Sequence, residues 1–106
     1  MKKIFLDIRH GKGKNAKGYV LDISKTGIGI VCDKKVSKKS IVGISSKVHT
    51  FPFLKGKVAY ITLRQVKPYR FKLGIKFIPL KKRDREKLEN FVFKLEKRRA
   101  VRLSVM

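Results

Sequence analysis

Six consecutive residues near the start of the chain combine an acid, a hydroxyl and a glycine in a pattern that can bind a small polar ligand. They run from Asp22 through Ser24 to Gly27 and read Asp-x-Ser-x-x-Gly. Apolar runs flank them, from Tyr19 to Ile23 and from Ile28 to Cys32. A short polar bend closed by glycine between two such runs is typical of a β-hairpin. The sequence therefore predicts a hairpin whose tip presents carboxylate and hydroxyl groups.

A second group with binding chemistry lies at the opposite end of the chain. Arg98, Arg99 and Arg102 are close in sequence, and Arg98 and Arg102 have the spacing Arg-x-x-x-Arg. A guanidinium group can pair with a phosphate through two parallel hydrogen bonds, and it can also contact the O6 and N7 edge of guanine. The same cluster is equally what a basic helix end contains, because the helix macrodipole favours cations there.

Catalytic chemistry has little support. The glutamates all lie with Asp84 in one stretch near the C-terminus, where they balance the surrounding lysines. His10 and His49 have no neighbouring cysteine, histidine or acidic cluster, so no metal site is expected. Ser24 has no evident base partner, and the Gly11–Lys14 run is too short for a phosphate-binding loop. We expect a binding protein that is not an enzyme and has no metal or cofactor.

The charge balance indicates the kind of partner. The chain has 106 residues, of which 42% are hydrophobic, so one packed domain is expected. Its 29 lysines and arginines outweigh 7 acidic residues and give a formal charge of +22. Such a field favours an anionic partner, which can be a nucleotide, a nucleic acid or an acidic membrane surface.

The sequence also bears on location. Cys32 is the single cysteine, so no intrachain disulfide can form, and a reducing compartment is expected. The N-terminal apolar stretch stops at Asp7, too early for a signal peptide, and no run is long enough to span a bilayer. These observations predict a cytoplasmic protein.

Apolar periodicity predicts six strands and one helix in a single domain, 1–106. The clearest strand alternates Phe71, Leu73, Ile75 and Phe77 with basic residues and Gly74. Leu88, Phe91, Val92 and Leu95 follow at helical spacing. The expected strands are 4–8, 19–23, 28–32, 41–48, 56–63 and 71–77, with a loop over 11–18, a helix over about 81–97 and a C-terminal arm over 98–106. This order is typical of a small all-β antiparallel barrel, about residues 2–79, with a helix beside it.

These residues resemble the PilZ domain, a six-stranded barrel with a helix that serves as a receptor for cyclic di-GMP. The run Gly18 to Ile30 is similar to the second and third strands of the family around its Asp/Asn-x-Ser-x-x-Gly motif. The Gly56–Tyr60 segment resembles a later strand that begins Gly-x-Val, and Gly74–Phe77 resembles the last strand, Gly-x-x-Phe. The resemblance covers most of the chain and implies bacterial second-messenger signalling.

One departure from the family pattern concerns the arginines. In the family an Arg-x-x-x-Arg motif precedes the first strand, whereas here it follows the helix, as if the order were circularly permuted. Because domain termini often lie close together, the C-terminal arm can fold back and supply Arg98, Arg99 and Arg102 to the hairpin. The arm can also serve a neighbouring subunit, or the chain can be one piece of a tandem array.

The resemblance implies a role for each candidate residue. Asp22 and Ser24 are expected to bind guanine, and Gly27 to supply a positive φ and a close backbone approach. The three arginines are expected to clamp the ligand. The helix and arm are also expected to offer a surface for a protein partner or for self-association. Phe93, which falls off the main helix face, is expected either to mark an oligomer contact or to cover the barrel.

Three alternatives stay open at this stage. Asp22 and Ser24 can cap their own hairpin by bonding local backbone. The chain can be a nucleic-acid-binding barrel that uses Arg70, Lys72 and Lys76, with Tyr60 and Tyr69 stacking on bases. It can also be a PilZ-like interaction module that has lost its ligand, which the displaced arginine motif favours.

Overall fold

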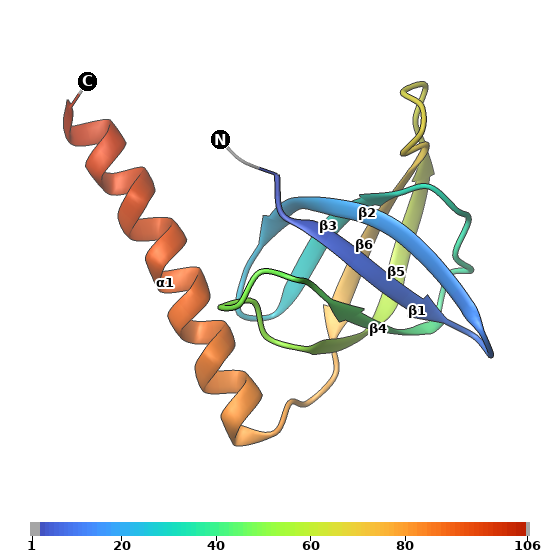
Figure 1. Cartoon of the computed structure of the whole chain (residues 1–106), viewed down its shortest axis with the longest axis horizontal. Helices are drawn as coiled ribbons and strands as arrows, with labels where there is room; N and C mark the ends of the chain where they lie inside the picture. The colour runs from blue at the N-terminus through green and yellow to red at the C-terminus, as the bar shows by residue number, and fades with distance from the viewer. Residues whose placement is uncertain (1–2, 106) are drawn as a thin grey trace.

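The fold is a closed six-stranded barrel with one long helix against its side (Figure 1). The computed structural model describes residues 3–105, and their side chains as far as Glu96. All strand pairs are antiparallel, in the closed order β1-β2-β3-β6-β5-β4. The elements are β1 (Phe5–His10), β2 (Lys14–Ile23), β3 (Gly27–Cys32), β4 (Ile41–Ser45), β5 (Leu54–Leu63), β6 (Phe71–Phe77) and α1 (Lys82–Val105). The predicted fold class is therefore confirmed, although the predicted start of the barrel at residue 2 lies outside the described residues.

Side-chain alternation along the strands builds the core. Inward residues from all six strands are almost fully buried, while their outward neighbours are mostly charged or polar. Burial of aliphatic side chains is the main stabilising term for a domain of this size. The barrel part of the core contains Leu6, Ile8, Ala16, Ile28, Ile30, Cys32, Val42, Ile44, Leu54, Val58, Leu73 and Ile75.

The helix covers one side of the barrel through a few residues. Leu88, Phe91 and Val92 belong to the main core, and the Phe91 ring meets Phe51 edge to face at 5.2 Å between centroids. Phe51 lies in the connection between β4 and β5, which Figure 1 shows beside α1. Phe93 falls off this face and is 64% exposed, as the helical spacing predicts.

Four predicted strand boundaries are wrong by two residues or more. The first strand, predicted to end at residue 8, ends at His10. The loop predicted over 11–18 is only a turn, because β2 already begins at Lys14. Ala16 and Gly18 pair with Ile8 and Leu6, so small residues occupy the inward positions and conceal the strand pattern. The strand predicted over 41–48 ends at Ser45, and the one predicted from residue 56 begins at Leu54.

The predicted end of the helix at Lys97 is also wrong. α1 begins at Lys82 and stays helical to Val105, so the expected separate arm is the last part of the helix. No glycine or proline interrupts this segment, and these are the residues that normally end a helix. Arg98, Arg99 and Arg102 thus occupy the final turns of α1, and their side chains lie outside the described residues.

Cys32 is buried, and its thiol is expected to be unreactive. Its Sγ donates a hydrogen bond to the Lys34 carbonyl at 3.2 Å. Burial raises the pKa of the thiol to about 11. The thiol is therefore protonated at neutral pH.

Within residues 3–105 no helix is long and apolar enough to cross a membrane.

His10 should make stability depend on pH. Its Nε2 is buried without a partner among the described residues, and burial, then Lys14 and Lys34, lower its pKa below the ordinary 6.5. The unfolded chain therefore binds a proton more readily, so the free energy of unfolding should fall as the pH drops below about 6.5. Urea unfolding at about pH 5.5 and 7.5 measures this loss. His10→Gln should reduce it, whereas an equal loss in His10→Gln and wild type would contradict the assignment; His49→Gln is the matched control.

Candidate functional site

Two β-bulges turn the candidate site residues to the outside of the barrel. In β2 the register shifts between Val20 and Asp22, and in β5 it shifts between Val58 and Tyr60. Each bulge inserts one residue, Leu21 or Ala59, and so reverses the alternation beyond it. Without the first bulge Asp22 would follow Val20 into the core. The bulges therefore place the Asp22 and Tyr60 side chains on the outer surface.

Between these two side chains lies a floor of glycine. Asp22 pairs with Gly29, Gly29 with Gly74, and Gly74 with Tyr60, in one row across β2, β3, β6 and β5. A Cβ on Gly74 would lie 1.9 Å from the Tyr60 ring, and one on Gly29 would lie 2.6 Å from Asp22 Oδ1. The two glycines thus let the end side chains fold onto the sheet. Gly74 therefore serves this packing against Tyr60.

Asp22 is held by a backbone hydrogen bond. Its Oδ1 accepts from the Gly29 amide at 3.0 Å, while the residue as a whole stays exposed. Among the described residues no hydrogen bond engages Oδ2. The carboxylate is therefore fixed in position with one oxygen available to a ligand.

Ser24 organises the turn. Its Oγ accepts from the amides of Thr26 and Gly27, each at 3.2 Å, and the Ser24 amide donates to the Gly27 carbonyl at 2.9 Å. These bonds are those of a side chain that closes its own turn. Ser24 therefore caps its own turn, as one of the alternatives from the sequence predicts. Asp22 does so through one carboxylate oxygen, Oδ1.

Gly27 is needed for a different reason from the one expected. The glycines with positive φ are Gly11 (64°) and Gly13 (65°), in the turn before β2, whereas Gly27 has none. A Cβ on Gly27 would instead lie 2.7 Å from the Ile75 carbonyl oxygen. The expected positive φ is thus wrong, and the expected close backbone approach is present, toward β6.

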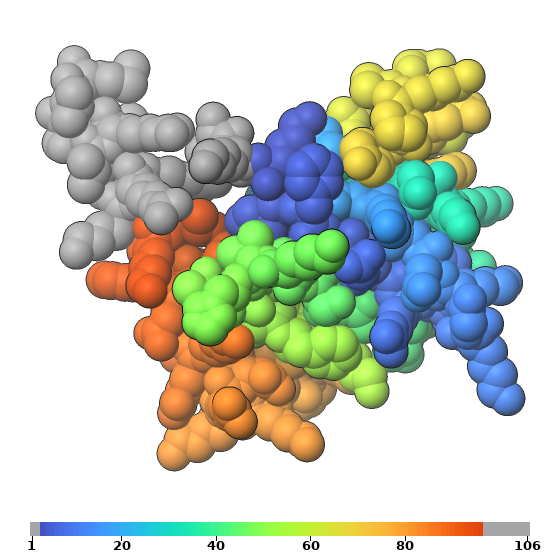
Figure 2. Space-filling view, viewed as in Figure 1, coloured from blue at the N-terminus to red at the C-terminus, as the bar shows by residue number. Residues whose placement is uncertain are grey.

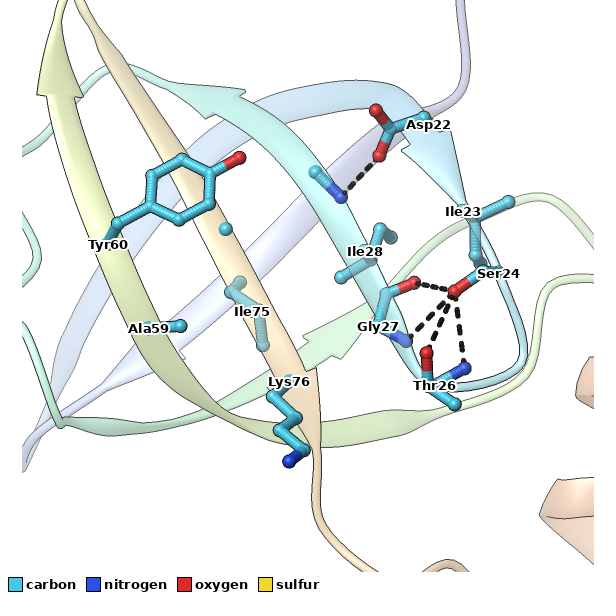
Figure 3. A pocket seen from close by; sticks show the side chains of 12 residues that line it. Asp22, Ile23, Ser24, Thr26, Gly27, Ile28, Ala59, Tyr60, Ile75 and Lys76 are labelled. Carbon is cyan, nitrogen blue, oxygen red and sulfur yellow. Dashed lines mark hydrogen bonds between the residues drawn. The ribbon is translucent and has the colours of Figure 1, made fainter.

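These residues line a shallow groove of about 380 Å³ on the outside of β2, β3, β6 and β5. Tyr60 and Ala59 form one wall and the Asp22–Gly27 hairpin the other, with the exposed Lys76 at one end (Figure 3). Sequence reasoning did not place Tyr60, Gly29, Gly74 or Lys76 in this site. The Gly-x-Gly spacing of Gly27 and Gly29 was the available signal, but the pairing of Gly29 with Gly74 exists only in the closed sheet.

The other sequence-predicted site residues are not brought to this groove within the described part of the chain. α1 carries positions 98–102 past the barrel, beyond the turns that pack on it (Figure 1). Tyr69, expected to stack on bases, packs edge-on against Tyr19 at 5.2 Å between centroids. Of the two tyrosines in the nucleic-acid alternative, Tyr60 alone keeps an open position, with 47% of its side chain exposed.

Comparison with known proteins establishes the class. The family model of the PilZ domain matches residues 3–94, and the chain belongs to this family. A solved structure described as the PilZ domain with c-di-GMP of YcgR from Escherichia coli superposes with a TM-score of 0.74. The two chains share 12% sequence identity, over 98% of this chain and 89% of that one. None of the curated proteins compared with this sequence matches it. Positions 98–102 lie beyond the family match.

Proposed function

We propose that this PilZ domain is a receptor for cyclic di-GMP and binds it on the groove between Asp22 and Tyr60. The observation that carries the proposal is the Asp22 carboxylate, fixed on the outer surface beside an open groove with one oxygen unengaged. Membership of the PilZ family and the likeness in fold to a PilZ domain with c-di-GMP support the choice of ligand.

The groove offers complementary groups to this ligand. The second carboxylate oxygen of Asp22 can accept from the N1 and N2 hydrogens of guanine, as a carboxylate does when it reads a donor edge. Ser24 presents its hydroxyl at the rim and sets the shape of the turn, and Gly27 allows the turn to lie close to β6. Lys76 places a cation at the end of the groove for a phosphate.

We assign the arginine clamp to Arg98, Arg99 and Arg102. With α1 helical through these positions, one route to the groove is bending of the helix end within one chain, and a second is supply from α1 of a neighbouring copy. A tandem arrangement, in which an adjoining domain supplies them, is the third route. The first two routes keep the permuted order of the motif, with the arginines at the end of the helix instead of before β1.

Calorimetry with cyclic di-GMP at moderate salt tests the proposal. Wild type should bind near micromolar or tighter, and Asp22→Ala should weaken binding about tenfold or more, because it removes a charged acceptor. Asp22→Asn keeps an acceptor for the Gly29 amide and should retain more affinity. Asp33→Ala is the matched control, because Asp33 Oδ1 accepts from the Lys17 amide at 2.8 Å outside the groove.

The outcomes separate the remaining functions. No heat with wild type would overturn the receptor function and leave a PilZ interaction module. Equal losses in Asp22→Ala and Asp33→Ala would show that the loss is not specific to the groove and would overturn the site. Equal binding of linear and cyclic dinucleotides, with steep weakening by salt, would indicate a nucleic-acid-binding barrel instead.

A further inference from the structure

The hairpin between β5 and β6 projects from one end of the barrel (Figures 1 and 2). The Arg64 amide donates to the Arg70 carbonyl and closes its base. Two aliphatic side chains stand out from it, Leu63 at 58% exposure and Val66 at 57%. Both are among the most exposed large apolar residues in the described part of the chain. A projecting tip with unburied aliphatic groups costs hydration free energy unless another surface covers it.

The hairpin itself carries cations and no acid. Lys67 and Arg70 are exposed on the hairpin, and Arg64 lies at its base. Between Asp33 and Asp84 every aspartate and glutamate is missing, so the sheet formed by β4, β5 and β6 carries positive charge alone. The hairpin therefore lies at the end of a surface of one sign, which attracts an extended anionic surface.

Aromatic side chains extend the tip across the same end of the barrel. Tyr69 packs against Tyr19, and Tyr19 against Phe5, whose ring is 56% exposed, at 6.0 Å between centroids. Lys3 Nζ lies 4.5 Å from the Tyr19 ring centroid. Tyrosine and lysine side chains of this kind, apolar along their length and polar at the end, suit the boundary between lipid headgroups and acyl chains.

We propose that this end of the domain binds the surface of an anionic lipid bilayer, with Leu63 and Val66 entering the interface. The cations of the hairpin would contact lipid headgroups while the two aliphatic groups leave water. A nucleic acid would satisfy the same charges, but Leu63 and Val66 offer nothing to phosphates and have no flat ring to stack on bases. The aliphatic tip therefore favours lipid. The proposal is independent of the cyclic di-GMP groove.

Flotation with lipid vesicles tests this inference on the full chain. Wild type should float with phosphatidylcholine vesicles that contain phosphatidylglycerol, and not with phosphatidylcholine alone. Leu63→Ser with Val66→Ser keeps all charges and should weaken binding about tenfold. The matched control is Ile41→Ser with Val48→Ser, two aliphatic residues with 49% and 40% exposure elsewhere on the barrel, which should bind as wild type does.

A second pair of variants tests the position of the charges. Lys67→Glu with Arg70→Glu should abolish flotation, whereas Lys12→Glu with Lys38→Glu makes the same change in net charge in two other loops and should weaken it less. Equal binding by the Leu63/Val66 variant and wild type would overturn the proposal. So would failure of wild type to float while it binds a single-stranded oligonucleotide, which would assign this surface to nucleic acid. Unchanged thermal unfolding confirms that each variant is folded.

Discussion

A chain that ends after Glu96 should lose cyclic di-GMP binding and keep its fold. The deletion removes Arg98, Arg99 and Arg102, which we assign to the phosphates and guanines of the ligand. Loss of several charge-assisted contacts should weaken affinity about a hundredfold or more. The core should survive because Leu88, Phe91 and Val92, the helical residues that pack on the barrel, all remain. Calorimetry measures the affinity, and thermal unfolding followed by circular dichroism measures the fold.

A matched pair of variants separates the arginines from general charge. Arg98→Ala with Arg102→Ala should reproduce the loss, whereas Arg83→Ala with Arg85→Ala, at exposed positions near the start of the same helix, should have little effect. Normal binding by the truncated chain would overturn the arginine assignment but leave Asp22 in place. Mixing the truncated chain with a full-length Asp22→Ala chain tests the source of the arginines, because recovered binding means that one copy completes the site of another.

Gly18→Ala should destabilise the barrel more than any other single methyl addition at its glycines. An ideal Cβ at Gly18 would lie 1.7 Å from the Val31 carbonyl oxygen and 2.9 Å from the Cys32 Cα. Both contacts are to backbone of β3, which cannot move without breaking its pairing with β2. We expect a loss of about 3 kcal/mol or more in the free energy of unfolding, the range of severe overpacking.

Gly43→Ala is the control for Gly18→Ala. Both glycines lie in strands and neither has a positive φ, so the gain in backbone entropy on substitution is similar. A Cβ on Gly43 would meet only the Phe53 ring, at 3.2 Å, and Phe53 is 51% exposed and free to shift. We expect a change within about 1 kcal/mol. Urea unfolding measures the free energy of unfolding of both variants. Similar values would contradict the prediction, because they would mean that the β3 backbone shifts to accommodate the methyl group at Gly18.

Much of the barrel could be predicted because local patterns agree with the fold. Phe71 to Phe77 alternate strictly and form β6, and Leu88, Phe91 and Val92 repeat at helical spacing and pack on the core. The first part of β2 was missed because its inward positions hold Ala16 and Gly18, which give no apolar signal. The end of α1 was missed because the basic residues after Lys97 include no helix breaker. Such a run can either continue the helix or form a separate segment after it.

The residues of this chain suffice to predict a basic single-core barrel with an Asp-x-Ser-x-x-Gly hairpin and an arginine cluster. The direction in which the Asp22 and Tyr60 side chains point depends on the folded sheet. The bulges at Leu21 and Ala59 turn Asp22 and Tyr60 outward, and the pairing of Gly29 with Gly74 opens the floor between them. A bulge depends on the register between two strands, and the glycine floor depends on the pairing of four neighbouring strands. Both arise from contacts between residues far apart in the chain, which no local pattern records.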